Sequence, residues 1–475
     1  MGNLRAHAVR YGLAKIASQP PVGMQMAWLM TDGTVLGQSY AGNTWYRYAP
    51  DVNGGYADGT WTQVASLQTG YAPSAFASAL LADGRLVISG GEYNTPGQYD
   101  LQLTNKGAVY DPVANTWTPL GHPKGWGFIG DSPSTVLPDG RFVVGQKLSH
   151  QDAALNPATL SWTKMGDTGK ADFNSEEGWT LLPDGTILTE DVKNAPNSER
   201  YNPSTGQWTS AGSTIVDLHS PSPYHQCLTY GPKPKDCYLP PGEIGPAVLR
   251  PDGTVFATGS GSGPYGSGPG HTAIFHPSGS GGSWTQGPDF PGSDNAGDSF
   301  AALLPSGNVL VFGVSGELYE FNGTSMTQKG SAFGSPLLLP TGQVMILGYS
   351  SVGLYTPAGS PQASWLPKIT STPKTLARGQ SYTISGKQFN GLSQAMSFGD
   401  EFQNCTNYPL VRITNKATGH VFYARTHDHS SMGVATGSLT VSTHFDVPAT
   451  METGPSKLQV VANGLASTAV AVTVQ

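Results

Sequence analysis

Charge is scarce in this sequence, and its distribution excludes a polyanionic partner. Asp, Glu, Lys and Arg make up only 12% of the 475 residues, whereas about a quarter is usual in a globular protein. The formal net charge is −7, and Lys and Arg form no cluster that could neutralise phosphate groups. We therefore expect neither nucleic acid nor a membrane surface among the partners.

Long apolar runs and helical periodicity are also missing. No stretch approaches the roughly 20 apolar residues that a membrane helix needs, and no helix-period pattern exceeds two turns. The first 25 residues lack the apolar core of a signal peptide, so either export is absent or a leader has been removed. The composition favours removal, and we expect a secreted or periplasmic protein whose leader is absent from this sequence.

Cysteine is rare, with three residues in the whole chain. Cys227 and Cys237 bracket a Pro-rich stretch, where a disulfide would staple a loop, but spacing alone does not decide between a disulfide and two free thiols. Cys405 is left over in either case. We expect it to be a buried, inert thiol rather than a nucleophile, because nearby acids would disfavour the thiolate.

Glycine and proline, in contrast, are abundant (62 and 37 residues), and they recur in a repeated sequence motif, which we call the repeated phrase. Two apolar runs flank a short turn whose glycine supplies a positive φ, which predicts a β-hairpin. A third strand and a fourth element, usually with Trp, follow each hairpin, and four strands per repeat indicate a propeller blade. The phrase occurs seven times, with its glycine at Gly33, Gly84, Gly140, Gly185, Gly253, Gly307 and Gly342.

The repeat divides the chain into three parts. Residues 1–20 form an N-terminal segment and residues 21–366 a seven-bladed β-propeller. From residue 367 the sequence pattern changes to longer alternating strands, and residues 367–475 are predicted to form an immunoglobulin-like β-sandwich. In the last two blades we place the fourth strand at Met326 and Trp365. The predicted fold class is all-β.

The blade phrases LADGRLVISGG, AVYDP and TW, followed by the C-terminal sandwich, carry a family likeness. Together they resemble the kelch-type propeller of galactose oxidase and glyoxal oxidase, with its early-set immunoglobulin-like domain. That resemblance implies a copper radical enzyme with a Cys-linked Tyr, a second Tyr and two His. In this sequence the positions that correspond to those copper ligands are Met26, Ala75 or Phe76, Ala332, Phe333 and the stretch 398–408. None of them provides the expected ligand, and copper is therefore disfavoured.

The repeat also defines equivalent positions at the start of each innermost strand, where the blades converge on the axis. Three of the seven are acidic, namely Asp131, Glu176 and Asp298, and Glu177 and Glu243 lie beside them. Clustered carboxylates raise at least one pKa and provide an acid and base pair, or they bind a divalent cation. The alternative is that these acids face solvent or accept hydrogen bonds from turn amides.

Two further sets of residues are candidates for substrate binding. Trp126 and Trp179 flank the acidic positions and could stack on sugar rings, although core packing is the commoner role of Trp. Asp400 and Glu401 lie in a stretch that corresponds to a loop reaching the propeller axis in the similar enzymes. We assign these four, with Glu177 and Glu243, to substrate binding.

The motif RTHDHSS gives the weak candidates for a metal site. His427 and His429 are two residues apart in a predicted strand, which would place both on one face, with His444 as a third ligand. A structural role for these histidines is the favoured alternative, so no metal site is predicted.

The leading hypothesis is an extracytoplasmic, monomeric carbohydrate-active enzyme, a hydrolase or lyase, with Asp131, Glu176 and Asp298 as catalytic residues. Its substrate would be a glycan or another small molecule. One alternative is a non-catalytic propeller that binds glycans or proteins. Another is a copper radical oxidase with an unrecognised site.

Overall fold

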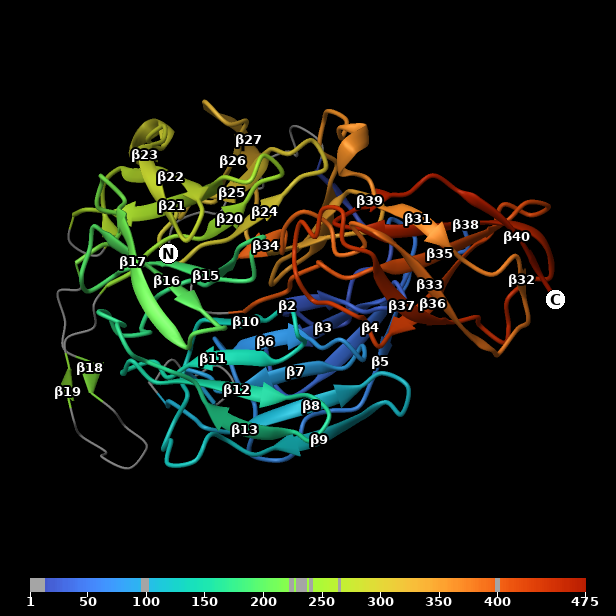
Figure 1. The fold of residues 1–475 in the computed structure, drawn as a ribbon, viewed down its shortest axis with the longest axis horizontal. Helices are drawn as coiled ribbons and strands as arrows, with labels where there is room; N and C mark the ends of the chain where they lie inside the picture. Colours follow the sequence, from blue (N-terminus) through green and yellow to red (C-terminus); the bar gives the residue numbers. More distant parts are fainter. Residues whose placement is uncertain are drawn as a thin grey trace.

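The computed structural model describes residues 13–94, 102–221, 242–263, 266–397 and 402–475, together with the backbone of β18 (Gln226–Cys227) and β19 (Cys237–Tyr238). Seven antiparallel sheets surround one axis, and a curled sheet follows at the C-terminal end (Figure 1). None of the helices among the described residues is long and apolar enough to cross a membrane. The predicted all-β fold, a seven-bladed propeller followed by a β-sandwich, is confirmed.

Each blade runs from an innermost strand near the axis to an outermost strand. The first four blades are β2 (Met24–Leu29), β3 (Val35–Ser39), β4 (Trp45–Ala49) and β5 (Thr60–Gln63); β6 (Ala77–Leu80), β7 (Leu86–Ser89), β8 (Gly107–Asp111) and β9 (Thr116–Leu120); β10 (Ser134–Val136), β11 (Phe142–Gly145), β12 (Asp152–Asn156) and β13 (Ser161–Lys164); β14 (Thr180–Leu181), β15 (Ile187–Glu190), β16 (Asn197–Asn202) and β17 (Gln207–Ser213). The last three are β20 (Ala247–Leu249), β21 (Val255–Gly261), β22 (Gly270–Ser278) and β23 (Gly281–Gln286); β24 (Ala301–Leu303), β25 (Val309–Phe312), β26 (Glu317–Phe321) and β27 (Met326–Ser331); β28 (Ser335–Leu338), β29 (Val344–Leu347), β30 (Val352–Tyr355) and β1 (Leu13–Lys15).

The repeated phrase forms the hairpin between the first and second strand of every blade. Its glycine has φ between 76° and 90° in all seven cases, a conformation that costs other residues free energy. In the first blade the Asp32 carboxylate also accepts a hydrogen bond from the Thr34 amide at 3.0 Å, which closes the turn. The seven predicted hairpins therefore form for the expected local reason.

The last blade differs from the prediction in its fourth strand. Trp365 lies in the 3₁₀ turn η3 (Ala363–Trp365), and the outermost strand is instead β1, which pairs with β30. Residues 13–15 of the expected N-terminal segment thus belong to the seventh blade. Joining both ends of the ring in one sheet ties the propeller closed, which a strand from the C-terminal side would not do.

The C-terminal domain is a nine-stranded sheet that curls around its own apolar core, which includes Ile384, Val411 and Phe445. Its strands are β31 (Lys368–Ser371), β32 (Thr375–Leu376), β33 (Ser381–Lys387), β35 (Leu410–Asn415), β36 (Val421–His427), β37 (Val441–Asp446), β38 (Gly454–Ala462), β39 (Leu465–Ala466) and β40 (Val470–Val474). The kelch-type assignment of the blades and the immunoglobulin-like assignment of this domain stay predictions.

This domain packs against the face of the propeller that carries the repeated turns. The amides of Thr426, His429 and Met432 donate to the carbonyls of Thr31, Ala82 and Pro138, at 3.0 to 3.1 Å. Those three acceptors lie in or beside the turns of the first three blades. The opposite face, where the innermost strands begin, is therefore left free by these contacts, and we call it the mouth.

A segment of the C-terminal domain enters the propeller between the innermost strands. β34 (Met396–Ser397) pairs with β24 and lies near the middle of the ring (Figure 1). The Asn404 amide donates to the carbonyls of Ala27 at 3.0 Å and Pro336 at 2.7 Å, in the first and seventh blades. The nearby Cys405 is half-buried, and desolvation raises the pKa of its thiol to about 12; that this thiol is inert stays a prediction.

Candidate active site at the propeller mouth

Lys147 is the centre of the mouth. It follows β11 in the third blade, and the whole residue is 0% exposed. Its ammonium group lies 2.9 Å from Glu176 Oε1 and 3.2 Å from Glu92 Oε1, and it also contacts the Asp131 carboxylate. Carboxylates from the second, third and fourth blades thus meet on one buried cation.

Two more carboxyl groups, from the fifth and sixth blades, act electrostatically on this group. Burial and then repulsion by Glu176 raise the pKa of Glu243 well above its ordinary value. Burial, followed by repulsion from Glu176 and Glu92, raises the pKa of Asp298 to about 6. The Asp298 residue is itself exposed to solvent.

Asp131 is the most deeply placed of the five acids, with an exposed fraction of 1%. Burial and the charge of Glu92 raise its pKa, while Lys147 lowers it, and the net result lies well above the ordinary value. One of its oxygens, Oδ1, has no hydrogen-bond partner among the described residues. The mouth therefore combines carboxyl groups that differ in their affinity for protons.

The backbone at these positions is unusual. Ala75, Glu176 and Asp298, three of the seven equivalent positions, have φ of 49°, 61° and 52°, a region that non-glycine residues seldom occupy. After this conformation successive side chains diverge: Glu176 reaches Lys147, whereas Glu177 binds Lys170. The prediction that Glu177 shares the mouth is therefore corrected.

Lys147 and Glu92 were not predicted from the sequence. The acidic positions that the repeat defines precede the innermost strands, whereas these two residues follow the second strands β11 and β7. Antiparallel pairing brings both kinds of position to the same end of the blade. Comparing the residues after each second strand, GGE in one blade and GQK in the next, would have found them.

The two tryptophans are core residues. Trp126 is 5% and Trp179 is 2% exposed. The Trp126 indole donates to Gln151 Oε1 at 2.9 Å, and Trp179 packs on Trp208 with a ring separation of 5.9 Å. Neither has an exposed ring face, so the predicted stacking on sugars is corrected to core packing. Asp400 and Glu401 lie outside the described residues.

Exposed aromatic rings occur instead on the mouth side of the first and seventh blades. Phe333 precedes β28 and is 70% exposed, and Tyr349 follows β29 and is 71% exposed. Tyr349 meets Tyr40, which follows β3, edge to face at 4.8 Å. Such rings can pack on apolar faces of a ligand. In the sequence, Phe333 is one of the seven equivalent positions of the repeat and also falls where the resemblance would place a copper ligand.

The copper that the architecture implies does not fit these residues. Copper(II) sites in proteins use imidazole and thiolate or similar ligands. Met26 and Phe76 are buried apolar residues, Ala75 and Ala332 have no donor atom, and Phe333 is an exposed phenyl ring. The charged groups at the mouth are carboxylates around one ammonium. We therefore derive no copper chemistry for this site.

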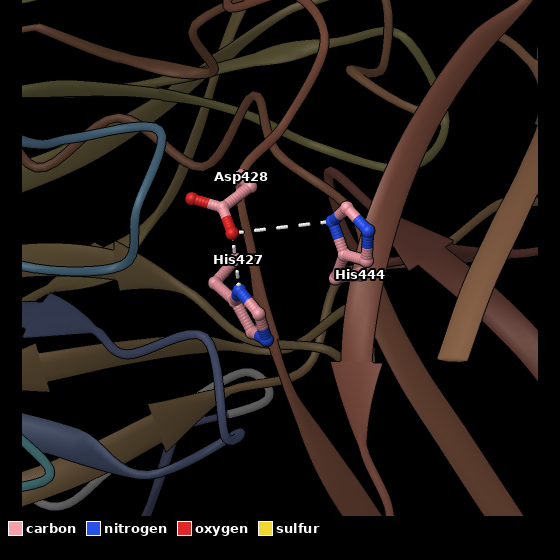
Figure 2. Close-up of side chains that lie close together, drawn as sticks. All are labelled: His427, Asp428 and His444. Atoms are coloured by element: carbon pink, nitrogen blue, oxygen red, sulfur yellow. Dashed lines mark hydrogen bonds and ion pairs between the residues drawn. The ribbon is translucent and has the colours of Figure 1, made fainter. Parts of the chain in front are cut away.

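The histidines of the C-terminal domain are arranged differently from the prediction. β36 ends at His427, and Asp428 has φ of 51°, so His429 leaves the strand and is buried; burial lowers its pKa to about 3. His427 is paired instead with His444 on β37 (Figure 2). Its ring nitrogens lie 2.8 Å from Asp428 and 3.1 Å from Asp446, so carboxylates already occupy both potential ligand atoms.

The sequence matches no family model and no curated protein. Among solved structures, a fungal alcohol oxidase of the AA5 family, in complex with copper, has a TM-score of 0.53 at 15% identity, covering 98% of this chain and 100% of that one. The architecture is galactose oxidase-like. A streptogramin B lyase covers 72% of this chain and 96% of its own (TM-score 0.49, 11% identity), and the virginiamycin B lyase of Staphylococcus aureus gives similar values. At these identities the likeness concerns the fold alone.

Proposed function

We propose that this protein is a carbohydrate-active enzyme that cleaves glycosidic bonds with the carboxyl groups of the mouth. One observation carries the proposal: five consecutive blades each contribute one acid, and within the described part of the chain one buried ammonium, that of Lys147, lies among them. The acids are Glu92, Asp131, Glu176, Glu243 and Asp298. An extracytoplasmic location is part of the same proposal.

The raised pKa values supply the acid and base that hydrolysis needs. Glu243, whose pKa burial and repulsion by Glu176 raise well above its ordinary value, is the carboxyl group suited to donate a proton to a leaving-group oxygen. Asp298, with a pKa of about 6, is mostly ionised at pH 7 and reaches solvent, so it can activate water. A pair of carboxyl groups with these two roles is the requirement of glycoside hydrolysis.

The negative charge of the mouth restricts the class of sugar that can bind there. Negative carboxylates repel an acidic sugar, and Lys147, the cation at its centre, is already surrounded by three of them. A lyase acting on uronic acids would need free positive charge to bind its substrate, so a neutral or amino sugar and a hydrolase are favoured. Phe333 and Tyr349 supply exposed rings on the same face.

Single substitutions test the proposal. We expect Glu243→Gln and Asp298→Asn each to lower kcat/KM on the cleaved glycan by 10²-fold or more, and Asp298→Asn to remove the acidic limb of the pH profile. Asp139→Asn, an exposed turn residue paired with Arg141, is the matched control and should keep full activity. Unchanged turnover in both mouth variants would refute the assignment.

A non-catalytic glycan-binding propeller is the second candidate, and the contacts of Lys147 favour it. An ammonium paired with three carboxylates is also expected in an ion network that only stabilises the fold. Binding on a glycan array without turnover, and unaffected by Asp298→Asn, would support this candidate. A divalent cation at the mouth stays a prediction.

A further inference from the structure

A second group of acids lies inside the fourth blade, beside the mouth but separate from it. Asp172 and Glu177 precede the innermost strand β14, and Asp191 directly follows β15. All three are buried, and each offers a carboxylate oxygen within 4.8 Å of the others. This blade-four cluster thus brings together three acids from two segments of the chain.

The positive charge beside the blade-four cluster does not balance the negative charge of its carboxylates. Lys170 Nζ lies 2.7 Å from Glu177 Oε1 and 2.8 Å from Glu199 Oε2, so it is already shared by two carboxylates. Asp172 and Asp191 have no ion-pair partner within the described part of the chain. Among the described residues, four buried carboxylates therefore face a single ammonium, and an unbalanced buried charge is costly.

Asp191 shows where a ligand is missing. The residue is 2% exposed. Its Oδ2 accepts a hydrogen bond from the Asn194 side-chain amide at 3.1 Å, whereas its Oδ1 is buried and has no hydrogen-bond partner among the described residues. A buried carboxylate oxygen that no donor reaches loses its hydration without compensation. A bound cation would satisfy it.

The neighbouring backbone holds the cluster in place. Asp172 accepts hydrogen bonds from the amides of Phe173 at 2.7 Å and Lys193 at 2.7 Å, which joins the segment before β14 to the loop after β15. Glu177 is fixed by Lys170 and by the Thr189 hydroxyl at 3.1 Å. The carboxylates are thus positioned by groups that leave further lone pairs free.

We propose that Asp172, Glu177 and Asp191 bind a divalent cation, of the hard class represented by Ca²⁺ and Mg²⁺. Carboxylate oxygens are the ligands that these ions prefer. Glu177 is adjacent to Glu176, which contacts Lys147 at the mouth. The cation therefore fixes the segment from which Glu176 reaches the mouth, and this role does not depend on the activity proposed above.

Thermal unfolding of the full chain tests the site. After treatment with EDTA at pH 7.5, we expect saturating Ca²⁺ or Mg²⁺ to raise the Tm by on the order of 4 °C, as binding to the folded state requires. Asp191→Asn should abolish this response. Metal analysis of the untreated wild-type protein should find about one divalent ion per chain, and this readout requires no variant to fold.

Glu190→Gln is the matched control. Glu190 is the preceding residue and is also buried, and one of its carboxylate oxygens has no hydrogen-bond partner in the described part of the chain. Burial raises its pKa to about 8, but it is outside the cluster. It should keep the full response to the cation. A wild-type Tm that neither EDTA nor either cation changes would overturn the proposal. So would an undiminished response in Asp191→Asn, or its equal loss in Glu190→Gln.

Discussion

Replacing Lys147 with Met tests whether the mouth depends on one buried ammonium. The change keeps the length of the side chain but leaves the Glu92, Asp131 and Glu176 carboxylates without their shared cation. Removing one partner from a buried ion pair typically costs about 3 to 5 kcal/mol. Because Lys147 is 0% exposed and serves three acids, we expect a loss of this size in the free energy of unfolding at pH 8.

The loss of stability in Lys147→Met should depend on pH, and the pKa of Asp131 gives the direction of this dependence. In the wild type Lys147 lowers the pKa of Asp131, which burial and Glu92 raise. Without Lys147 this pKa rises further, so the variant relieves its excess charge by binding protons as the pH falls. The loss in Lys147→Met should therefore shrink between pH 8 and pH 5.

Urea unfolding followed by tryptophan fluorescence measures the effect. The double variant with Asp131→Asn should recover at least about 1 kcal/mol, because the two residues are coupled. Lys164→Met removes an exposed pair with Asp167 and should change stability by less than about 0.5 kcal/mol. A loss below about 1 kcal/mol in Lys147→Met at pH 8, or no recovery in the double variant, would refute this account.

Two further predictions concern single residues. The pKa of Asp298, raised to about 6 from 3.8, means that its contribution to stability is greatest below pH 4 and is lost as the pH rises through 6; the Tm of Asp298→Asn relative to the wild type should therefore increase between pH 4 and 7, and a difference that is constant with pH would contradict the shift. The Cys405 thiol, with its pKa raised to about 12, should resist iodoacetamide at pH 8 in the native protein and react readily only after denaturation, as peptide mass spectrometry would show; rapid native labelling would contradict the raised pKa.

Local signals made most of the fold predictable. The turn glycines Gly33 to Gly342 mark the seven hairpins because their positive φ is a property of the residue itself. Ring closure was not predictable in this way. The pairing of β1 with β30 joins Leu13 to Tyr355, and no local pattern specifies a contact between positions so far apart in the chain.

The candidate site was predictable only in part, for the same reason. Asp131, Glu176 and Asp298 followed from their equivalent places in the repeat, whereas Glu92 and Lys147 lie at a different register. His429 was misplaced because Asp428 ends the strand with a positive φ, which the alternation of side chains along a strand does not anticipate. The two tryptophans were ambiguous, since core packing and ligand stacking use the same residue type.

The seven hairpins, their turns and their repetition can be read from the residue pattern, because they depend on neighbouring residues. Which charges meet depends on packing between the blades. Glu176 and Glu177 are adjacent in the chain, yet one contacts Lys147 at the mouth and the other Lys170 inside the fourth blade. A buried charge is stabilised by partners from other strands and blades, and the closure of the ring determines which of these partners lie within reach.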